Sequence, residues 1–149
     1  TIRNTDMIRT SMVFTHNSEG GRWLRWMDAI CFPEYEPFEF DGSEWFLIED
    51  DGNPVAYCGW RKINANIGEL CRSGVLPEAR GKGLQKYMLG YRESIMRNRQ
   101  IILSVTTTDK NNFRSINNLI DCGYRACAKD DWPTVKADKS GAVYWKKRI

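Results

Sequence analysis

The sequence predicts an α/β fold in which helices flank a mixed sheet, and it predicts one domain over residues 1–149. Helical and strand patterns alternate along the chain, and a strand, helix, strand succession in the second half predicts a parallel strand pair. The length of 149 residues is enough to bury a core, and 42% apolar with 28% charged residues is ordinary for a soluble globular protein.

The first third of the chain predicts a strand, a helix and a loop. Apolar and polar residues alternate roughly over Met7–Thr15, which indicates a strand. An amphipathic helix that ends near Pro33 follows, because helical spacing predicts a buried stripe of Trp23, Trp26, Met27 and Ile30. Residues 33–43 are rich in acids and aromatics without a strong period, so we expect a loop or a short helix there.

A hairpin and a longer strand come next. Strand patterns over Trp45–Glu49 and Val55–Trp60 flank the turn-forming sequence Asp50–Pro54, which predicts a hairpin. The residues Ile67–Leu76 predict one strand that runs into a glycine-rich segment.

Two helices and three strands are predicted for the second half. The first helix carries an apolar stripe of Leu84, Tyr87, Met88, Tyr91 and Ile95. A buried strand over Ile101–Val105 and a polar loop over Thr106–Asn112 lead to a helix that ends before Gly123 and is lined by Phe113, Ile116 and Ile120. A last strand pair, joined by a long excursion, is expected over Tyr124–Ala128 and Ala142–Ile149.

The segment Val75–Gln85 is the strongest chemical signal, because it is a basic, glycine-rich turn between a strand and a helix. Glycines let the backbone approach a ligand closely, and the first amides of a helix point free N–H groups at an anion. Arg80 and Lys82 add positive charge, so we expect the turn to hold a phosphorylated ligand. A helix start with incidental glycines is the alternative.

Two common phosphate loops do not fit these residues. A P-loop requires Lys and Ser or Thr after its last glycine, but Leu84 follows Gly83. A dinucleotide fingerprint requires a third glycine where this chain has Lys86. The segment instead resembles the acetyl-CoA loop of the GCN5-related N-acetyltransferases, [Q/R]-x-x-G-x-[G/A] after a strand that ends Val-x-Pro. Arg80-Gly81-Lys82-Gly83-Leu84-Gln85 matches it except at Gln85.

A second motif of this family, N-x-x-[A/S]-I followed by G-[F/Y], is similar to Asn112–Ile116 and Gly123-Tyr124. The resemblance implies the acyl-CoA N-acyltransferase fold, a mostly antiparallel sheet with a splayed parallel pair. It implies acetyl-CoA as acyl donor, with pantetheine on the backbone of Ser73, Gly74 and Val75 and pyrophosphate on the amides of the loop, Arg80, Gly81, Lys82, Gly83, Leu84 and Gln85. Asn112 and Ser115 are expected to touch the cofactor arm, although Asn112 could equally be an N-cap.

The implied reaction is direct transfer of the acetyl group to a primary amine of a small molecule or protein. Glu69 resembles the catalytic base of one branch of the family, and it would share a strand face with Val75; a solvated strand end is the alternative. The family's usual acid is a tyrosine at the position of Leu119, which cannot donate a proton. Tyr124 is the candidate for the general acid instead, and the alternative is that Tyr124 is an aromatic residue of the core.

The acceptor site is expected from Cys31–Trp45 and Lys129–Gly141. Four acids would favour a cationic small molecule or basic protein: Glu34, Glu36, Glu39 and Asp41. The residues Tyr35, Phe38 and Trp132 could form an aromatic wall, and an exposed loop without a role is the alternative.

Charge, cysteine content and sequence pattern limit the remaining partners. The net charge of +3 argues against nucleic acid, and no apolar run suggests a membrane span. Five scattered cysteines without C-x-x-C spacing predict reduced thiols in the cytoplasm and no metal site. An exposed last strand, Val143–Ile149, could support a homodimer. Leu119 and Gln85 keep open a catalytically weak or inactive acyl-CoA-binding or partner-binding module.

Overall fold

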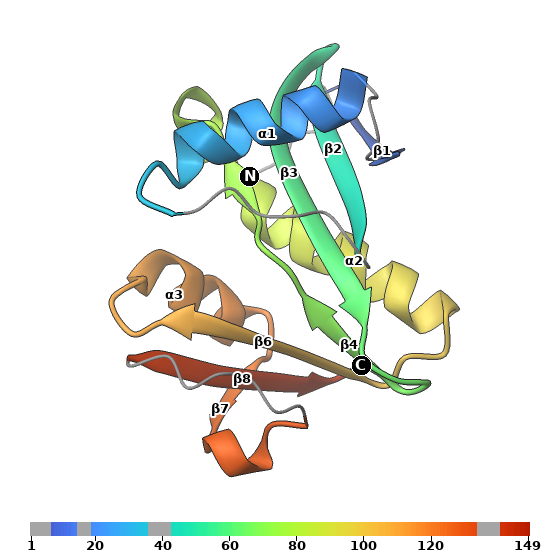
Figure 1. The fold of residues 1–149 in the computed structure, drawn as a ribbon, viewed down its shortest axis with the longest axis vertical. Helices are drawn as coiled ribbons and strands as arrows, with labels where there is room; N and C mark the ends of the chain where they lie inside the picture. Colours follow the sequence, from blue (N-terminus) through green and yellow to red (C-terminus); the bar gives the residue numbers. More distant parts are fainter. Residues whose placement is uncertain (1–6, 15–18, 36–42, 134–140) are drawn as a thin grey trace. The chain divides into compact units, whose positions relative to one another are not determined.

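The computed structural model describes residues 7–14, 19–35, 43–133 and 141–149 (Figure 1). The predicted fold class is confirmed, because the described elements are helices, antiparallel strand pairs and one parallel pair. The chain divides into two compact units, residues 1–61 with 71–88 and residues 62–70 with 89–149. No described helix is both long enough and apolar enough to cross a membrane.

The first unit is built on three antiparallel strands: β1 (Ile8–Val13), β2 (Glu44–Asp50) and β3 (Asn53–Lys62). The predicted hairpin is confirmed, with a shorter turn than expected because Pro54 already lies in β3. Asp51 and Gly52 form its tip with φ of 51° and 80°. Two successive positive φ values match the right-handed twist of the strands, which is why Asp-Gly is favoured at this point.

Helix α1 (Glu19–Cys31) forms where expected but buries a different face. Its buried residues are Gly21, Leu24, Met27 and Asp28, whereas Trp26 is 50% exposed. The predicted stripe is therefore wrong at Trp26 and Ile30, which are exposed, and is confirmed at Met27 and in part at Trp23, which packs half-buried against the core. The i, i+3, i+7 series of Leu24, Met27 and Cys31 has the same helical period, and these residues pack against Val13 and Trp45.

The predicted single strand Ile67–Leu76 is wrong, because the chain leaves the sheet between β4 (Ile67–Leu70) and β5 (Gly74–Val75). β5 pairs antiparallel with β3, with Tyr57 opposite Gly74. A Cβ atom on Gly74 would lie 2.6 Å from the Tyr57 ring and 2.9 Å from Cys31 Sγ. Only glycine leaves room at position 74 for the Tyr57 ring and the Cys31 thiol. The break between β4 and β5 means that Glu69 and Val75 do not share a strand face.

The second unit pairs four strands: β4, β6 (Leu103–Asp109), β8 (Ala142–Arg148) and β7 (Arg125–Cys127). The predicted parallel pair is confirmed as β4 with β6, from Ile67 opposite Leu103 to Glu69 opposite Val105. β6 continues through residues 106–109, which were expected in a loop, because β8 pairs with it along that length. β8 also pairs with β7 at residues 144–146, so the predicted exposed edge at Val143–Ile149 is wrong for these three residues.

The two later helices also bury faces that differ from the predicted stripes. α2 (Leu84–Asn98) buries Leu84 and Met88 as expected, but it also buries the charged residues Arg92 and Glu93. α3 (Phe113–Asp121) buries Leu119, whereas Phe113 is 68% and Ile120 54% exposed. Gly123 has a φ of 93°, which confirms it as the residue that ends this helix.

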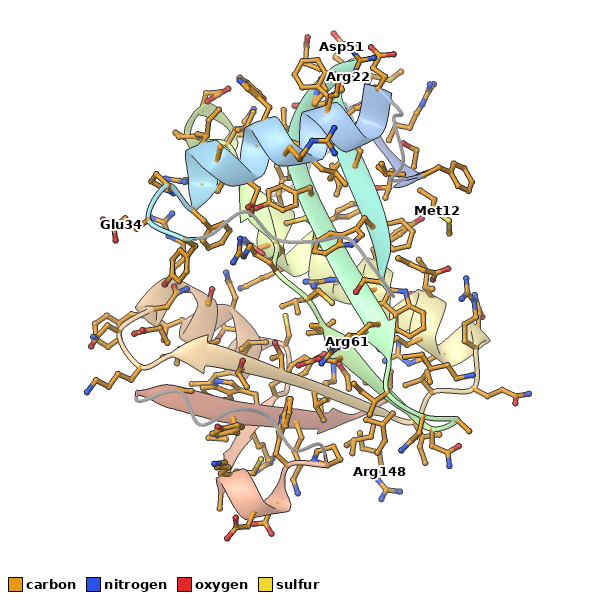
Figure 2. The ribbon with its side chains drawn as sticks, viewed as in Figure 1. Met12, Arg22, Glu34, Asp51, Arg61 and Arg148 are labelled. Carbon is orange, nitrogen blue, oxygen red and sulfur yellow. The ribbon has the colours of Figure 1, made fainter. Side chains whose placement is uncertain are left out.

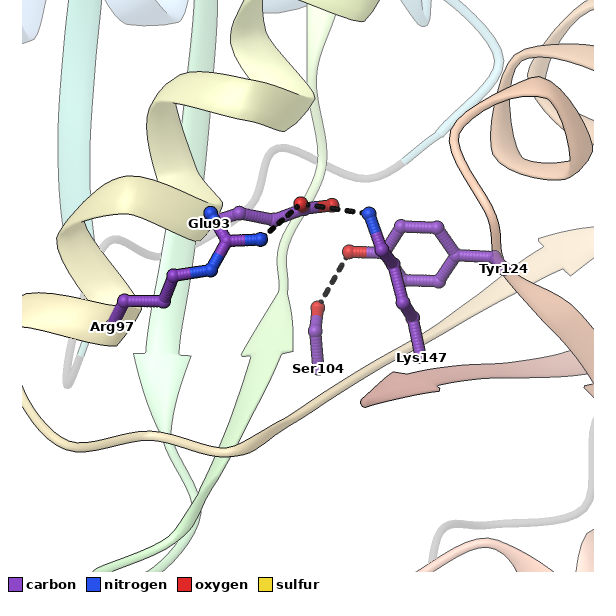
Figure 3. A network of polar contacts seen from close by, with 5 residues as sticks. All are labelled: Glu93, Arg97, Ser104, Tyr124 and Lys147. Carbon is purple, nitrogen blue, oxygen red and sulfur yellow. Dashed lines mark hydrogen bonds and ion pairs between the residues drawn. The ribbon is translucent and has the colours of Figure 1, made fainter. Parts of the chain in front are cut away.

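A buried carboxylate organises the polar part of the second unit (Figure 3). Glu93 Oε1 accepts a hydrogen bond from Lys147 Nζ at 2.9 Å and one from Arg97 at 3.4 Å. The Lys147 ammonium lies over the Tyr124 ring at 5.6 Å, and the Tyr124 and Ser104 hydroxyls are 2.7 Å apart. Burial raises the pKa of Tyr124, and the Glu93 charge adds to the effect, so the phenol stays protonated.

Replacing Glu93 with Gln should lower the free energy of unfolding by about 3 kcal/mol, because Lys147 and Arg97 lose the charge that faces them. Urea unfolding of the variant against the unchanged chain measures this difference. Glu34→Gln is the matched control: Glu34 is exposed and points away from the ribbon in Figure 2, so its change should stay within about 0.5 kcal/mol. Equal small effects at both positions would contradict the importance of the network.

Candidate functional site

The glycine-rich segment makes a sharp turn into the open end of a helix. A short 3-10 helix, η1 (Pro77–Ala79), is followed by Gly81 and Gly83, whose φ values are 82° and 81°. The Gly83 carbonyl accepts from the Tyr87 N–H at 3.0 Å, so α2 starts directly after this glycine. The amides of Leu84 and Gln85 belong to the first turn, where an α-helix offers no acceptor for them. The turn therefore presents backbone donors in the way that an anion site requires.

Two side-chain hydrogen bonds connect the glycine-rich turn to β5 and the residue before it. Ser73 Oγ donates to Gln85 Oε1 at 3.0 Å, and Arg80 Nε donates to the Val75 carbonyl at 3.1 Å. Four of the predicted site residues thus meet in pairs within the first unit. The Ser73 contact also gives Gln85 a physical purpose at a position where the family pattern has a small residue, because a glycine or alanine could not accept this bond.

Lys82 supplies a cation that is held only loosely. Its Nζ lies 3.7 Å from Asp50 Oδ2, and half of its side chain is exposed. An exposed ion pair of this length contributes little to stability, so the ammonium can turn toward a ligand at small cost.

Val75 turns its peptide group away from β3. The Leu76 N–H donates to the Val55 carbonyl at 2.9 Å, and Ala56 lies opposite Val75 one step along. Because antiparallel pairs alternate between hydrogen-bonded and non-hydrogen-bonded positions, the N–H and C=O of Val75 point to the other side of β5. The Cys31 thiol, 3.5 Å from the Val75 oxygen, agrees with this direction.

Asn112 begins α3 as an N-cap in the second unit. Its side-chain oxygen accepts from the Ser115 N–H at 3.3 Å, which brings these two predicted residues together. Of the two alternatives for Asn112, the N-cap is therefore observed, and contact with a cofactor stays a prediction.

Glu69 is buried in β4, with 3% of its surface exposed. The alternative of a solvated strand end is therefore wrong. An interior glutamate is uncommon unless it is paired or has a function.

Tyr124 and Leu119 are both buried in the second unit. Tyr124 is 2% exposed, and its hydroxyl is bonded to Ser104. These contacts favour its role as a core aromatic, while its role as an acid stays a prediction.

Only part of the predicted acceptor region falls within the described residues. Glu34 and Tyr35 are exposed on the loop after α1, whereas Glu36, Phe38, Glu39 and Asp41 lie outside the described residues. Trp132 is not part of an exposed wall, because it is buried and its indole N–H donates to the Trp145 carbonyl at 3.3 Å. Its ring packs edge-on against Tyr144 at 5.6 Å, so the prediction for Trp132 is wrong.

The sequence analysis missed a buried polar cluster of Asp28, Tyr57 and Arg72. The Tyr57 hydroxyl donates to Asp28 Oδ1 at 2.5 Å, and Arg72 donates from one terminal nitrogen to Oδ2 at 2.9 Å and Oδ1 at 3.2 Å. Phe32 and Tyr35 lie 5.0 Å and 5.5 Å from the Arg72 guanidinium. The position of Asp28 between Leu24 and Cys31, on the stripe that is buried, is the signal that could have shown it.

Burial raises the pKa of Asp28 above its ordinary value, and the hydrogen bond from Tyr57 and the charge of Arg72 oppose this effect. The same burial, with the Asp28 charge nearby, raises the pKa of Tyr57. Tyr57 is therefore protonated at neutral pH and donates to Asp28.

Comparison with solved structures finds the same fold in acetyltransferases. The structure matches an acetyltransferase from Streptococcus agalactiae with a TM-score of 0.79 at 9% identity, covering 95% of this chain and 98% of that one. It matches a GNAT family acetyltransferase from Elizabethkingia anophelis, solved with acetyl-CoA bound, with a TM-score of 0.75 at 12% identity over 95% and 98%. At these identities the likeness concerns the fold alone.

The family itself follows from the sequence comparison. The family model for the Acetyltransferase (GNAT) family matches residues 14–124, so the chain belongs to this family. A mycothiol acetyltransferase from Streptomyces griseus is 39% identical over 75 residues, which are 49% of this chain and 23% of that protein. The matched stretch is thus less than a quarter of the length of that relative.

Replacing Asp28 with Asn should lower the free energy of unfolding by about 1–3 kcal/mol at neutral pH, because the amide has one acceptor oxygen for Tyr57 and Arg72, whereas the carboxyl group offers them two. The ordinary pKa of an aspartate carboxyl is 3.8. When folding raises the pKa of a carboxyl, the carboxyl stabilises the folded chain less as the pH rises above this ordinary value. Asparagine does not titrate, so the stability difference between the unchanged chain and D28N should depend on pH.

The measurement is urea unfolding of the unchanged chain and D28N from neutral pH down to about pH 4. The difference in free energy should grow as the pH falls, because the unchanged chain regains the stability that ionisation of Asp28 removes. A difference that shrinks on acidification would contradict a raised pKa for Asp28.

Proposed function

We propose that the protein binds acetyl-CoA and transfers its acetyl group directly to a primary amine of a small molecule or protein. One observation supports this most: Gly81 and Gly83, both with positive φ, turn the chain directly into the first turn of α2, and the same turn carries Arg80 and Lys82. The family match supports it, and so does the acetyl-CoA bound to the structural relative from Elizabethkingia anophelis.

Each part of the donor would meet a different group of residues. The pyrophosphate would accept hydrogen bonds from the amides of the turn, from Arg80 to Gln85, with Arg80 and Lys82 balancing its charge. The pantetheine arm would pair with the backbone of Ser73, Gly74 and Val75, because the peptide of Val75 points away from β3. From the second unit, Asn112 and Ser115 are our candidates for contacts to the same arm.

The transfer itself requires a neutral amine, a polarised carbonyl and a route for one proton. The amine nitrogen forms a bond to the acetyl carbon, the carbon–sulfur bond breaks, and the sulfur leaves with the electron pair. The Val75 N–H is our candidate for polarising the thioester carbonyl. Glu69 is our candidate for accepting the amine proton, directly or through water, since its carboxylate lies in the interior beside the strand pair β4 and β6.

The departing thiolate needs a proton, and Leu119 cannot donate one because its side chain is apolar. Leu119 is also buried. Tyr124 is the candidate donor that the sequence offers, but its hydroxyl is bonded to Ser104. This observation favours a second candidate function, an acyl-CoA-binding module with weak or no turnover. The release of free thiol in the presence of a primary amine separates the two functions.

The proposal includes the localisation of the protein in the cell and its oligomeric state. We place the protein in the cytoplasm, because all five cysteines are free thiols in the structure. A homodimer stays a prediction without an assigned interface, since β7 and β6 pair with β8 on both sides at residues 144–146.

Calorimetric titration with acetyl-CoA tests the binding step. The chain should bind in the micromolar range, and the double variant Arg80→Glu, Gly83→Asp should lose about 100-fold or more, because two negative charges replace a cation and a close backbone approach. Gly90→Asp is the control for the Gly83→Asp change: it adds one negative charge within α2, at a position where a Cβ atom meets nothing within 4 Å.

The control variant should bind acetyl-CoA within about threefold of the unchanged chain, which shows that added charge alone is not responsible. If the unchanged folded chain binds no acetyl-CoA, or if the double variant binds equally well, the turn is not the donor site. In that case the proposed function fails at its first step.

Replacing Glu69 with Gln tests the catalytic base. We expect kcat to fall by about 100-fold at neutral pH while acetyl-CoA affinity is kept, because only the proton acceptor is removed. Steady-state thiol release across pH measures it, with Tyr124→Phe in parallel as a variant that removes the other candidate group. Full turnover of Glu69→Gln at every pH would exclude Glu69, and a loss in Tyr124→Phe alone would assign the chemistry to Tyr124.

A further inference from the structure

The cluster around Arg72 has the features of a recognition site for the acceptor. We infer that Arg72 binds a carboxylate of the acceptor, so that the preferred acceptor is an amino acid or a peptide-like amine with a carboxylate close to the reacting nitrogen. This inference rests on the proposed function, because it names the acceptor class for the same reaction.

Arg72 is fixed in one orientation by contacts on several sides. Asp28 accepts two contacts from one terminal nitrogen, at 2.9 Å and 3.2 Å. The Phe32 and Tyr35 rings lie within 5.5 Å of the guanidinium carbon. A long side chain held in this way loses little rotamer freedom when a ligand binds, which makes a guanidinium effective for planar anions.

The exposed fraction of each side chain shows whether Arg72 or Asp28 is accessible to a ligand. The Asp28 side chain is 7% exposed, whereas the Arg72 side chain is 25% exposed. Tyr35, whose ring contacts Arg72, is 58% exposed, and Tyr57, whose hydroxyl donates to Asp28, has no exposed surface. An incoming molecule therefore reaches the cation and an aromatic ring, and the buried anion stays out of reach.

The cluster is attached to the strand that we assign to the acetyl donor. Arg72 precedes Ser73, Gly74 and Val75 in the chain, and Tyr57 lies opposite Gly74 in the strand register. Three residues of extended chain span at most about 11 Å, so an acceptor bound at Arg72 can reach the acetyl group with a short carbon skeleton. This spacing favours a small molecule that carries its amine and its carboxylate near each other.

The charge balance favours a carboxylate over a phosphate. Asp28 offsets part of the Arg72 charge, so a monoanion gains a charge-assisted hydrogen bond while a dianion meets the second negative charge behind the guanidinium. The sequence had predicted a cationic acceptor from the acids between residues 34 and 41, whereas Arg72 predicts an acceptor that carries a carboxylate. Of those acids the structure describes Glu34, which is exposed and directed outward (Figure 2).

Matched pairs of amines test the inference. Each pair consists of an amino acid and its decarboxylated counterpart, such as lysine with cadaverine and tyrosine with tyramine, at equal acetyl-CoA concentration. The unchanged chain should acetylate the carboxylate-bearing member of at least one pair with a kcat/KM about tenfold or more above its counterpart. Phosphoethanolamine is included, and a preference for it over every amino acid would overturn the assignment of a carboxylate.

Variants at Arg72 separate recognition from folding. Arg72→Gln should lower kcat/KM for the carboxylate-bearing member by about 10- to 100-fold and leave its counterpart within about twofold, while Arg72→Lys should lose less. Arg22→Gln, an exposed arginine on α1, is the matched control and should change neither (Figure 2). Equal losses for both members of a pair would mean that Arg72 has only a structural role and would overturn the inference.

Calorimetry with acetyl-CoA keeps the two proposals distinguishable. If acetyl-CoA binds but the decarboxylated members are preferred, or if neither member of any pair is acetylated, the inference about Arg72 fails and the donor site stands. If acetyl-CoA does not bind to the unchanged chain, the proposed function fails before the acceptor is considered.

Discussion

The close pairing of β5 with β3 is the constraint on which the rest of the first unit depends. Gly74 lies against the Tyr57 ring, where a Cβ atom would be only 2.6 Å away. In this pairing the peptide of Val75 points away from β3, and the chain continues from β5 into η1 and α2. Any larger residue at position 74 would displace either β5 or Tyr57, and with them the turn that we assign to the donor.

Both units keep a carboxylate in their interior, and each carboxylate is held by cations. Asp28 is bonded to Tyr57 and Arg72, and Glu93 is bonded to Lys147 and Arg97. Buried ion pairs contribute little net stability compared with apolar packing, but losing one partner is costly. The two clusters differ in their place in the chain, because Arg72 directly precedes the Ser73–Val75 segment that we assign to the donor and contacts two aromatic rings, which is the basis for assigning it a role in recognition.

Local signals in the sequence predicted the hairpin turn, the glycine that ends α3 and the turn before α2, because each depends on backbone conformations that few residues adopt. The buried faces of α1 and α3 could not be predicted in the same way. Both helices carry two apolar stripes of equal period, and only tertiary packing decides between Trp26 and Leu24, or between Ile120 and Leu119. The Arg72 cluster was missed for a related reason, since its residues come from distant parts of the chain.

The central claim is that the backbone at the start of α2 holds the pyrophosphate of the donor. Amide ¹H–¹⁵N spectra of the labelled protein during titration with coenzyme A test it directly, because each N–H reports its own hydrogen bond. We predict that the largest shifts fall on the amides of residues 81–85 and on Val75. Shifts confined to other residues, such as those of α1, would contradict the account.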